Sequence, residues 1–300
     1  MLSAREARGG WIDGHMHVWN LDHPDSPHEE EALGSKVVRH YTLTDHVSEW
    51  KPRQVVHVEA IPRDSWQEVE WVERHAPGVG AVVASVHLEQ DGARELLERL
   101  SNLRKVRGVR QILNWEAGRP HCCWPFLKED LTRCETWRTG LALLAPLNLS
   151  FDLQCNPAQL VRASAAARIA NCRLVVNHLG VPQLDAKTDR DLWMQGLYHV
   201  ARHHPTASLK VSMLTHLFAD HRPWWASAEG REAALGLIHE AIRTFGSHRC
   251  MFASNAPVDA AFGLSPTDSM ALQDAIASTY DEEGRRSLYA GGAERAYALG

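Results

Sequence analysis

The chain has 300 residues, of which 44% are hydrophobic and 23% are charged, and its formal net charge is -5. This composition is typical of a globular protein and excludes collagen-like, disordered and fibrous classes. The negative net charge offers no basic field that would attract nucleic acid or an anionic membrane surface.

Membrane and secretory segments are not expected. The most apolar tract, residues 141–151, is shorter than the ~20 residues of a membrane helix and contains Pro146 and Asn148. The first ten residues lack the apolar core of a secretory signal. The six cysteines show neither zinc-like spacing nor the pattern of a small disulfide-linked domain, which favours a reducing, cytoplasmic location.

Short apolar or β-branched runs recur along the chain and predict strands. They are nearly continuous rather than alternating, as expected for strands that are covered on both faces. The eight predicted strands are residues 10–17, 53–60, 79–88, 106–113, 149–155, 173–180, 207–213 and 249–255.

Segments with helical periodicity lie between most of these strands. Asp64 is a suitable N-cap for one of them, and Pro157 suits the first turn of another. The predicted helices are residues 64–76, 91–103, 157–170, 189–204, 230–245 and 266–280. Alternating strands and helices predict an α/β fold, a (β/α)₈ TIM barrel in a single domain over residues 1–300. An open doubly wound sheet is the alternative, but no glycine-rich nucleotide-binding turn follows the first strand.

Histidines stand at the carboxyl ends of two predicted strands. His15 and His17 flank Met16, so strand alternation points both imidazoles into the barrel, and His178 ends the sixth strand. Because the chemistry of TIM barrels lies at the carboxyl ends of the strands, we expect the three imidazoles to meet in one cavity. Such a cluster suits polarisation of a substrate carbonyl or metal binding.

These motifs carry a resemblance to a known family. WIDGHMHVW, VVHVEA, GVRQILNW, VVNHLG, LKVS and RCMFASNAPVD together resemble the amidohydrolase superfamily. The similarity is greatest to its lactonase branch, which includes L-fuconolactonase and 2-pyrone-4,6-dicarboxylate lactonase, and it extends from Trp11 to the C-terminal AERAYAL. The resemblance implies a TIM-barrel hydrolase that opens a lactone or a related ester or amide bond.

The chain departs from the family at the end of the eighth strand, where Asn255 stands in place of an aspartate. A carboxamide cannot take a proton from water near neutral pH, and it is a weaker metal ligand than a carboxylate. The fifth strand also lacks the histidine of the wider superfamily. We therefore expect no tightly bound metal or other cofactor; the alternative is one divalent ion, such as zinc or manganese, on His15, His17 and His178.

Two carboxylates are candidates for the missing base. Glu59 lies two positions after His57, so we expect both side chains to point into the barrel, and Asp259 follows Asn255 by four residues. A loop or helix-cap role is the alternative for Asp259. Asn255 itself would orient water or substrate.

Further residues are candidates for substrate binding. Arg110 and Lys210 would hold an acidic or hydroxylated substrate, or form ion pairs with Glu59 or Asp152 inside the barrel. The other candidates are Gln154, which shares a strand face with Asp152, and the loop residues Trp19 and Trp115.

The resemblance and these residues favour a hydrolase that acts on a small-molecule lactone or similar cyclic ester. A non-hydrolytic enzyme on the same fold (a decarboxylase, hydratase or lactone isomerase) is the first alternative. A non-catalytic small-molecule binder is the second, because Asn255 replaces the aspartate. A homo-oligomer is compatible with the sequence.

Overall fold

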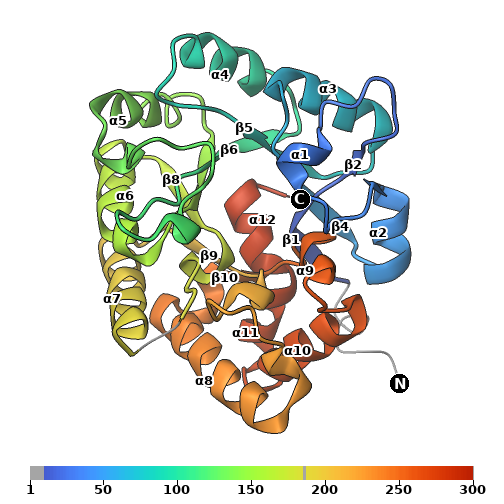
Figure 1. Cartoon of the computed structure of the whole chain (residues 1–300), viewed down its shortest axis with the longest axis vertical. Coiled ribbons are helices and arrows are strands. Elements are labelled where there is room, and N and C mark those ends of the chain that lie inside the picture. The colour runs from blue at the N-terminus through green and yellow to red at the C-terminus, as the bar shows by residue number, and fades with distance from the viewer. Residues whose placement is uncertain (1–9, 185–186, 300) are drawn as a thin grey trace.

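Eight parallel strands form one sheet whose spatial order follows the chain (Figure 1). The computed structural model describes residues 10–184 and 187–299. The strands are β1 (Ile12–Met16), β4 (Gln54–Val58), β5 (Ala81–Ser85), β6 (Val106–Ile112), β7 (Ser150–Gln154), β8 (Arg173–Val176), β9 (Ser208–Val211) and β10 (Cys250–Phe252). Each falls within one of the predicted ranges, so the prediction of eight parallel strands is confirmed.

Hydrogen bonds between the ends of β1 and β10 complete the ring. The Asn255 N–H donates to the carbonyl of His15 at 2.8 Å, and the His17 N–H donates to the carbonyl of Ala256 at 2.9 Å. Met16 and Ala256 form a parallel bridge at the same place. This closure confirms the predicted TIM barrel and places Asn255 beside the first-strand histidines.

Helices surround the ring of strands (Figure 1). The side chain of Asp64 accepts a hydrogen bond from the Gln67 N–H, as an N-cap does, and Pro157 is the first residue of its helix. The helices that the sequence predicts are α3 (Ser65–His75), α4 (Ala93–Ser101), α6 (Pro157–Ile169), α7 (Lys187–His203), α8 (Ala228–Phe245) and α10 (Pro266–Ser278).

Several shorter elements were not predicted, because they offer too few residues for a periodic signal. They are α1 (Glu30–Leu33), α2 (Leu43–Trp50), α5 (Glu135–Leu141), α9 (Val258–Ala261), α11 (Glu282–Arg286), α12 (Gly292–Tyr297), and the antiparallel pair β2 (Trp19–Asn20) and β3 (His40–Tyr41). Single helical turns also occur, one of them at His178–Gly180.

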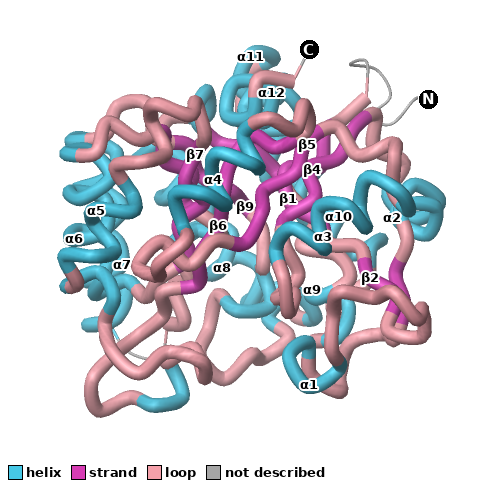
Figure 2. Tube along the Cα trace, turned by 90° about the horizontal axis from the view of Figure 1, so that it is seen from above, coloured by secondary structure: helices cyan, strands magenta, loops and turns pink. Residues whose placement is uncertain are grey.

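The two ends of the barrel are covered by different elements. Ala293 and Tyr297 of α12 pack against inward-facing strand residues such as Val56 and Met251. Figure 2 shows α12 at the end of the barrel opposite α1. The carboxyl ends of the strands are therefore left to the loops that form the cavity described below. In the described part of the chain, no helix has both the length and the apolar character that crossing a membrane requires.

Candidate active site

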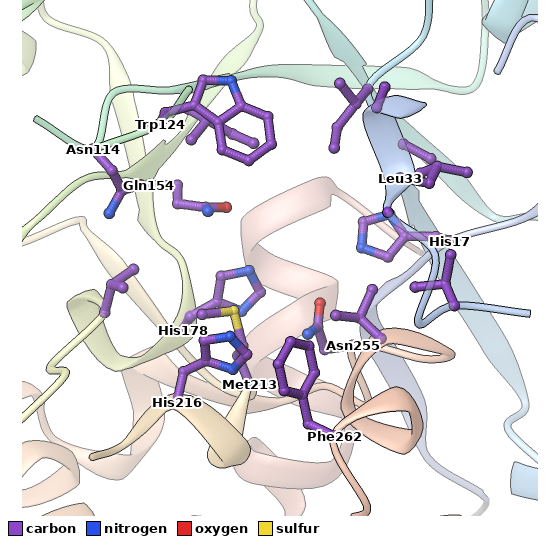
Figure 3. A pocket seen from close by; sticks show the side chains of 18 of the residues that line it. His17, Leu33, Asn114, Trp124, Gln154, His178, Met213, His216, Asn255 and Phe262 are labelled. Atoms are coloured by element: carbon purple, nitrogen blue, oxygen red, sulfur yellow. The ribbon is translucent and has the colours of Figure 1, made fainter. Parts of the chain in front are cut away.

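A cavity of about 540 Å³ opens at the carboxyl ends of the strands. Its lining includes His17 after β1, Arg110 of β6, Gln154 of β7, His178 after β8 and Asn255 after β10. Figure 3 labels all of these except Arg110. These residues lie far apart in the sequence, and the parallel barrel brings them together because all its strands end on the same face.

The three strand-end imidazoles lie together. The ring of His15 is 4.9 Å from that of His17 and 4.5 Å from that of His178, measured between centroids. Met16 packs in the outer apolar layer, so the two neighbouring histidines face the interior as predicted. His17 and His178 line the cavity, whereas His15 is fully buried and does not.

The surroundings of His17 leave one ring nitrogen free to accept a proton. Its Nδ1 lies 2.8 Å from the carbonyl oxygen of Val58. A carbonyl only accepts, so Nδ1 carries the hydrogen and Nε2 carries the lone pair. Burial, together with the charge of Arg110, lowers the pKa of His17 to about 3. The imidazole is therefore neutral at neutral pH.

His178 is held by the neighbouring strand. Its Nδ1 lies 2.9 Å from the Oγ of Ser212, which follows β9. Burial and the charge of Arg110 lower the pKa of His178 well below its usual range. His17 and His178 are therefore both uncharged where they line the cavity.

Arg110 is anchored by Glu59. The Nε of Arg110 donates to Oε1 of Glu59 at 2.6 Å, and another of its nitrogens donates to the Glu59 carbonyl at 2.7 Å. A third donates to Oε1 of Gln154 at 3.0 Å. Glu59 is buried and also accepts from the Ile61 N–H, so its carboxylate is engaged in orienting the guanidinium. It does not line the cavity, which weakens its candidacy as the base.

Asn255 is fixed from behind by Asp259. Its Nδ2 donates to Oδ1 of Asp259 at 3.0 Å, which directs the amide oxygen of Asn255 toward the cavity (Figure 3). Asp259 also accepts from the Thr215 hydroxyl at 3.1 Å and from the Leu214 N–H at 3.0 Å. It does not line this cavity. Burial raises the pKa of the Asp259 carboxyl to about 7.

Three expectations need correction. Lys210 does not reach the cavity: it is fully buried and its Nζ lies 2.7 Å from Oδ2 of Asp152, because an ammonium in the middle of the barrel needs an anionic partner. Trp115 lines a separate hollow outside the cavity. His57 points out of the barrel toward α3, where its Nε2 lies 3.5 Å from Glu68. Trp19 lines the cavity as expected, although its ring is fully buried.

Loop residues complete the cavity, and sequence reasoning missed them. Trp124, His216, Phe262 and Lys36 line it (Figure 3 labels the first three). None stands at a strand end, so position in the barrel gave no signal for them. Among the described lining residues there are two permanent cations, Lys36 and Arg110, and no aspartate or glutamate.

The fold and this strand-end cavity define the chain as a TIM-barrel protein of the amidohydrolase type. The family model described as Amidohydrolase matches residues 12–299, so the chain belongs to this family. A curated relative, the uncharacterized protein y4mH of Sinorhizobium fredii (strain NBRC 101917 / NGR234), is 26% identical over 269 residues, which are 84% of this chain and 86% of the relative.

Solved structures share the fold. An amidohydrolase from Burkholderia multivorans with bound zinc is 22% identical, with a TM-score of 0.77, and covers 97% of this chain and 99% of its own. A putative 2-pyrone-4,6-dicarboxylic acid hydrolase from Pseudomonas putida is 17% identical, with a TM-score of 0.73, and covers 96% of this chain and 97% of its own. At these identities the likeness supports the fold alone.

The histidines do not fit a metal ion in their present arrangement. The described residues contain no group of three histidine, cysteine or acidic side chains placed to hold one. Nε2 of His15 is buried and has no hydrogen-bond partner among the described residues, but Nδ1 of the same ring lies 3.2 Å from the Lys210 ammonium. The ammonium charge at this distance would repel a metal cation bound to the same imidazole.

Proposed function

We propose that the protein is a hydrolase that opens a lactone or related cyclic ester bearing an acidic group. The observation that supports it best is the charge of the cavity, which combines Arg110 and Lys36 with neutral imidazoles and has no carboxylate among its described lining residues. Such a lining favours a small anionic or hydroxylated molecule.

The proposed reaction uses groups of the chain itself. Arg110 donates hydrogen bonds from its remaining N–H groups to the substrate, and His17 accepts the proton of the attacking water on Nε2. The oxygen of Asn255 accepts a hydrogen bond from the same water and orients it. Water adds to the carbonyl carbon, the ring C–O bond breaks, and His17 returns the proton to the departing alkoxide.

The substrate itself would strengthen the base. Burial and the Arg110 charge hold the pKa of His17 at about 3 in the free protein, which makes it a weak base. A substrate carboxylate that pairs with Arg110 compensates this charge, so the basicity of His17 rises when substrate binds. Glu59 and Asp259 are weaker candidates, because both carboxylates are engaged in hydrogen bonds outside the cavity lining.

A second candidate function is a non-hydrolytic reaction, such as decarboxylation, hydration or lactone isomerisation. It is favoured by the carboxamide of Asn255, which stands where a carboxylate base would face the cavity. A binder without catalysis remains the third candidate for the same reason.

The test is a panel of lactones with and without a ring carboxylate, analysed by mass spectrometry. We expect ring-opened products that gain one water, mainly from the carboxylated members, and we expect His17→Gln to abolish turnover while binding persists. Release of carbon dioxide or an isomer without ring opening would support the second candidate. Binding with no product at all would support the third.

A further inference from the structure

A buried ionic network lies beneath the floor of the cavity. The Nζ of Lys210 on β9 is 2.7 Å from Oδ2 of Asp152 on β7, and both side chains are fully buried. The Tyr297 hydroxyl of α12 donates to the same carboxylate oxygen at 2.7 Å. Burial lowers the pKa of the Lys210 amine, and the Asp152 carboxylate at this distance opposes that effect and favours the ammonium form.

This ammonium also contacts the first-strand histidine. Its Nζ lies 3.2 Å from Nδ1 of His15. An ammonium has three donors and no acceptor, so the contact requires a lone pair on Nδ1. A neutral imidazole carries one hydrogen, and in His15 it must therefore be on Nε2.

His15 and His17 consequently hold opposite tautomers. The carbonyl of Val58 makes Nδ1 of His17 the donor, whereas Lys210 makes Nδ1 of His15 the acceptor. The rings are neighbours, with centroids 4.9 Å apart. One imidazole of the pair therefore exposes a lone pair to the cavity, and the other holds an N–H beneath it.

We propose that Lys210 is a positioning residue that fixes His15 as a hydrogen-bond donor and thereby withholds it as a metal ligand. A metal ligand needs a lone pair on the coordinating nitrogen, and Nε2 of His15 carries a hydrogen instead. This N–H is buried beneath the cavity and has no acceptor among the described residues. This inference goes beyond the proposed function and holds whichever reaction the cavity supports.

The first test reads the tautomer directly, without any activity assay. Protein labelled with ¹⁵N-histidine is compared by long-range ¹H–¹⁵N NMR with the variant His15→Gln, which identifies the His15 signals. We expect the Nε2–H tautomer in the natural protein. The Nδ1–H tautomer there would overturn the proposal.

A second test removes the network. Lys210→Met alone leaves Asp152 as an uncompensated buried charge and can prevent folding, so the decisive variant is Lys210→Met with Asp152→Leu and Tyr297→Phe, which replaces the network with apolar groups. We expect His15 to lose the fixed Nε2–H tautomer in this triple variant. The matched control, Tyr297→Phe, keeps Lys210 and should keep the tautomer. An unchanged tautomer in the triple variant would show that Lys210 does not set it.

Zinc binding supplies a third readout. We expect isothermal titration with zinc chloride to show at least tenfold tighter binding to the triple variant than to the natural protein or Tyr297→Phe. Adding His17→Ala to the triple variant should remove this gain. Stoichiometric tight zinc in the natural protein, or no gain in the triple variant, would overturn the claim that Lys210 withholds His15 from a metal.

Discussion

The Nδ2 of Asn255 donates a 3.0 Å hydrogen bond to Oδ1 of Asp259, a side chain that lies behind the cavity wall. This bond decides which end of the carboxamide the substrate meets: the amide NH₂ group faces Asp259, and the oxygen faces the cavity (Figure 3). Asn255 is therefore presented as an acceptor. The pair also explains why an aspartate at position 255 would be unfavourable in this chain.

Asn255→Asp places a second carboxylate at the contact with Asp259. Two carboxylates at such a short distance cannot both ionise readily, so they share one proton. At alkaline pH, where this proton is lost, their repulsion destabilises the folded protein. We expect Asn255→Asp to be about 1 to 3 kcal/mol less stable at pH 8 than the double variant Asn255→Asp with Asp259→Asn. Urea denaturation measures the difference, and equal stability of the two variants would contradict it.

Asp259 should give the protein a distinctive pH dependence. Burial raises the pKa of this carboxyl from 3.8 to about 7 in the folded state. Between pH 3.8 and about pH 7 the Asp259 carboxyl is protonated in the folded state and ionised in the unfolded state. Its contribution to stability is therefore present at low pH and is lost as the pH rises toward 7. The free energy of unfolding of the natural protein, relative to Asp259→Asn, should fall by about 2 to 3 kcal/mol between pH 5 and pH 8.

The control for this experiment is Thr215→Val, which removes one donor to Asp259 but keeps the carboxyl. We expect its stability to fall with rising pH as in the natural protein, but at higher pH, because the lost Thr215 hydrogen bond no longer lowers the pKa of Asp259. If the difference in free energy of unfolding between the natural protein and Asp259→Asn stays constant across this pH range, the Asp259 carboxyl is already ionised throughout it.

The sequence predicted the strands well because each buried strand is a run of consecutive apolar residues. Such a run can be recognised without knowing which strands lie beside it. The imidazole cluster followed from it, since His15 and His178 stand at strand ends and barrel topology brings strand ends together. The sequence carries no comparable signal for how far below the cavity a residue of a strand lies. For this reason the sequence left open whether Lys210 binds substrate or forms an ion pair inside the barrel, and the structure shows the ion pair with Asp152.

The loops were the least predictable part of the site. Trp115 and Trp124 come from one connection after β6, yet only Trp124 lines the cavity. Which of the two aromatic rings turns inward depends on how this connection folds back on itself, where the backbone N–H of Trp124 donates to the carbonyl of Asn114. His57 was placed inside the barrel by strand alternation, but its pairing with Glu68 of α3 shows that it faces outward.

Arg110 should control the basicity of His17. Replacing Arg110 and its partner together, in Arg110→Gln with Glu59→Gln, removes the guanidinium without leaving a buried charge unpaired. We expect the pKa of His17 to rise from about 3 toward its ordinary value of about 6.5, because the Coulombic effect of Arg110 is lost while burial remains. An NMR titration of the His17 ring measures this, with the exposed Arg99→Gln as the control.

The same double variant tests the proposed base. If His17 accepts the proton, the acidic limb of kcat/KM should move to higher pH together with the pKa of its ring. A limb that stays in place while the NMR titration moves would exclude His17 as the base.

Lys36 should attract anionic substrates to the cavity. It is exposed in the lining, with its Nζ 5.1 Å from the ring centroid of Phe262. We expect Lys36→Met to lower kcat/KM for a carboxylated lactone by roughly 3- to 10-fold at low ionic strength, and to leave a neutral lactone unaffected. Added salt should reduce this difference between the two lactones, since an exposed charge is screened.

The matched control is Lys51→Met. Lys51 is an exposed lysine just before β4 and hence at the opposite end of the strands. An equal loss with both lactones would mean that Lys36 shapes the cavity and does not act through its charge.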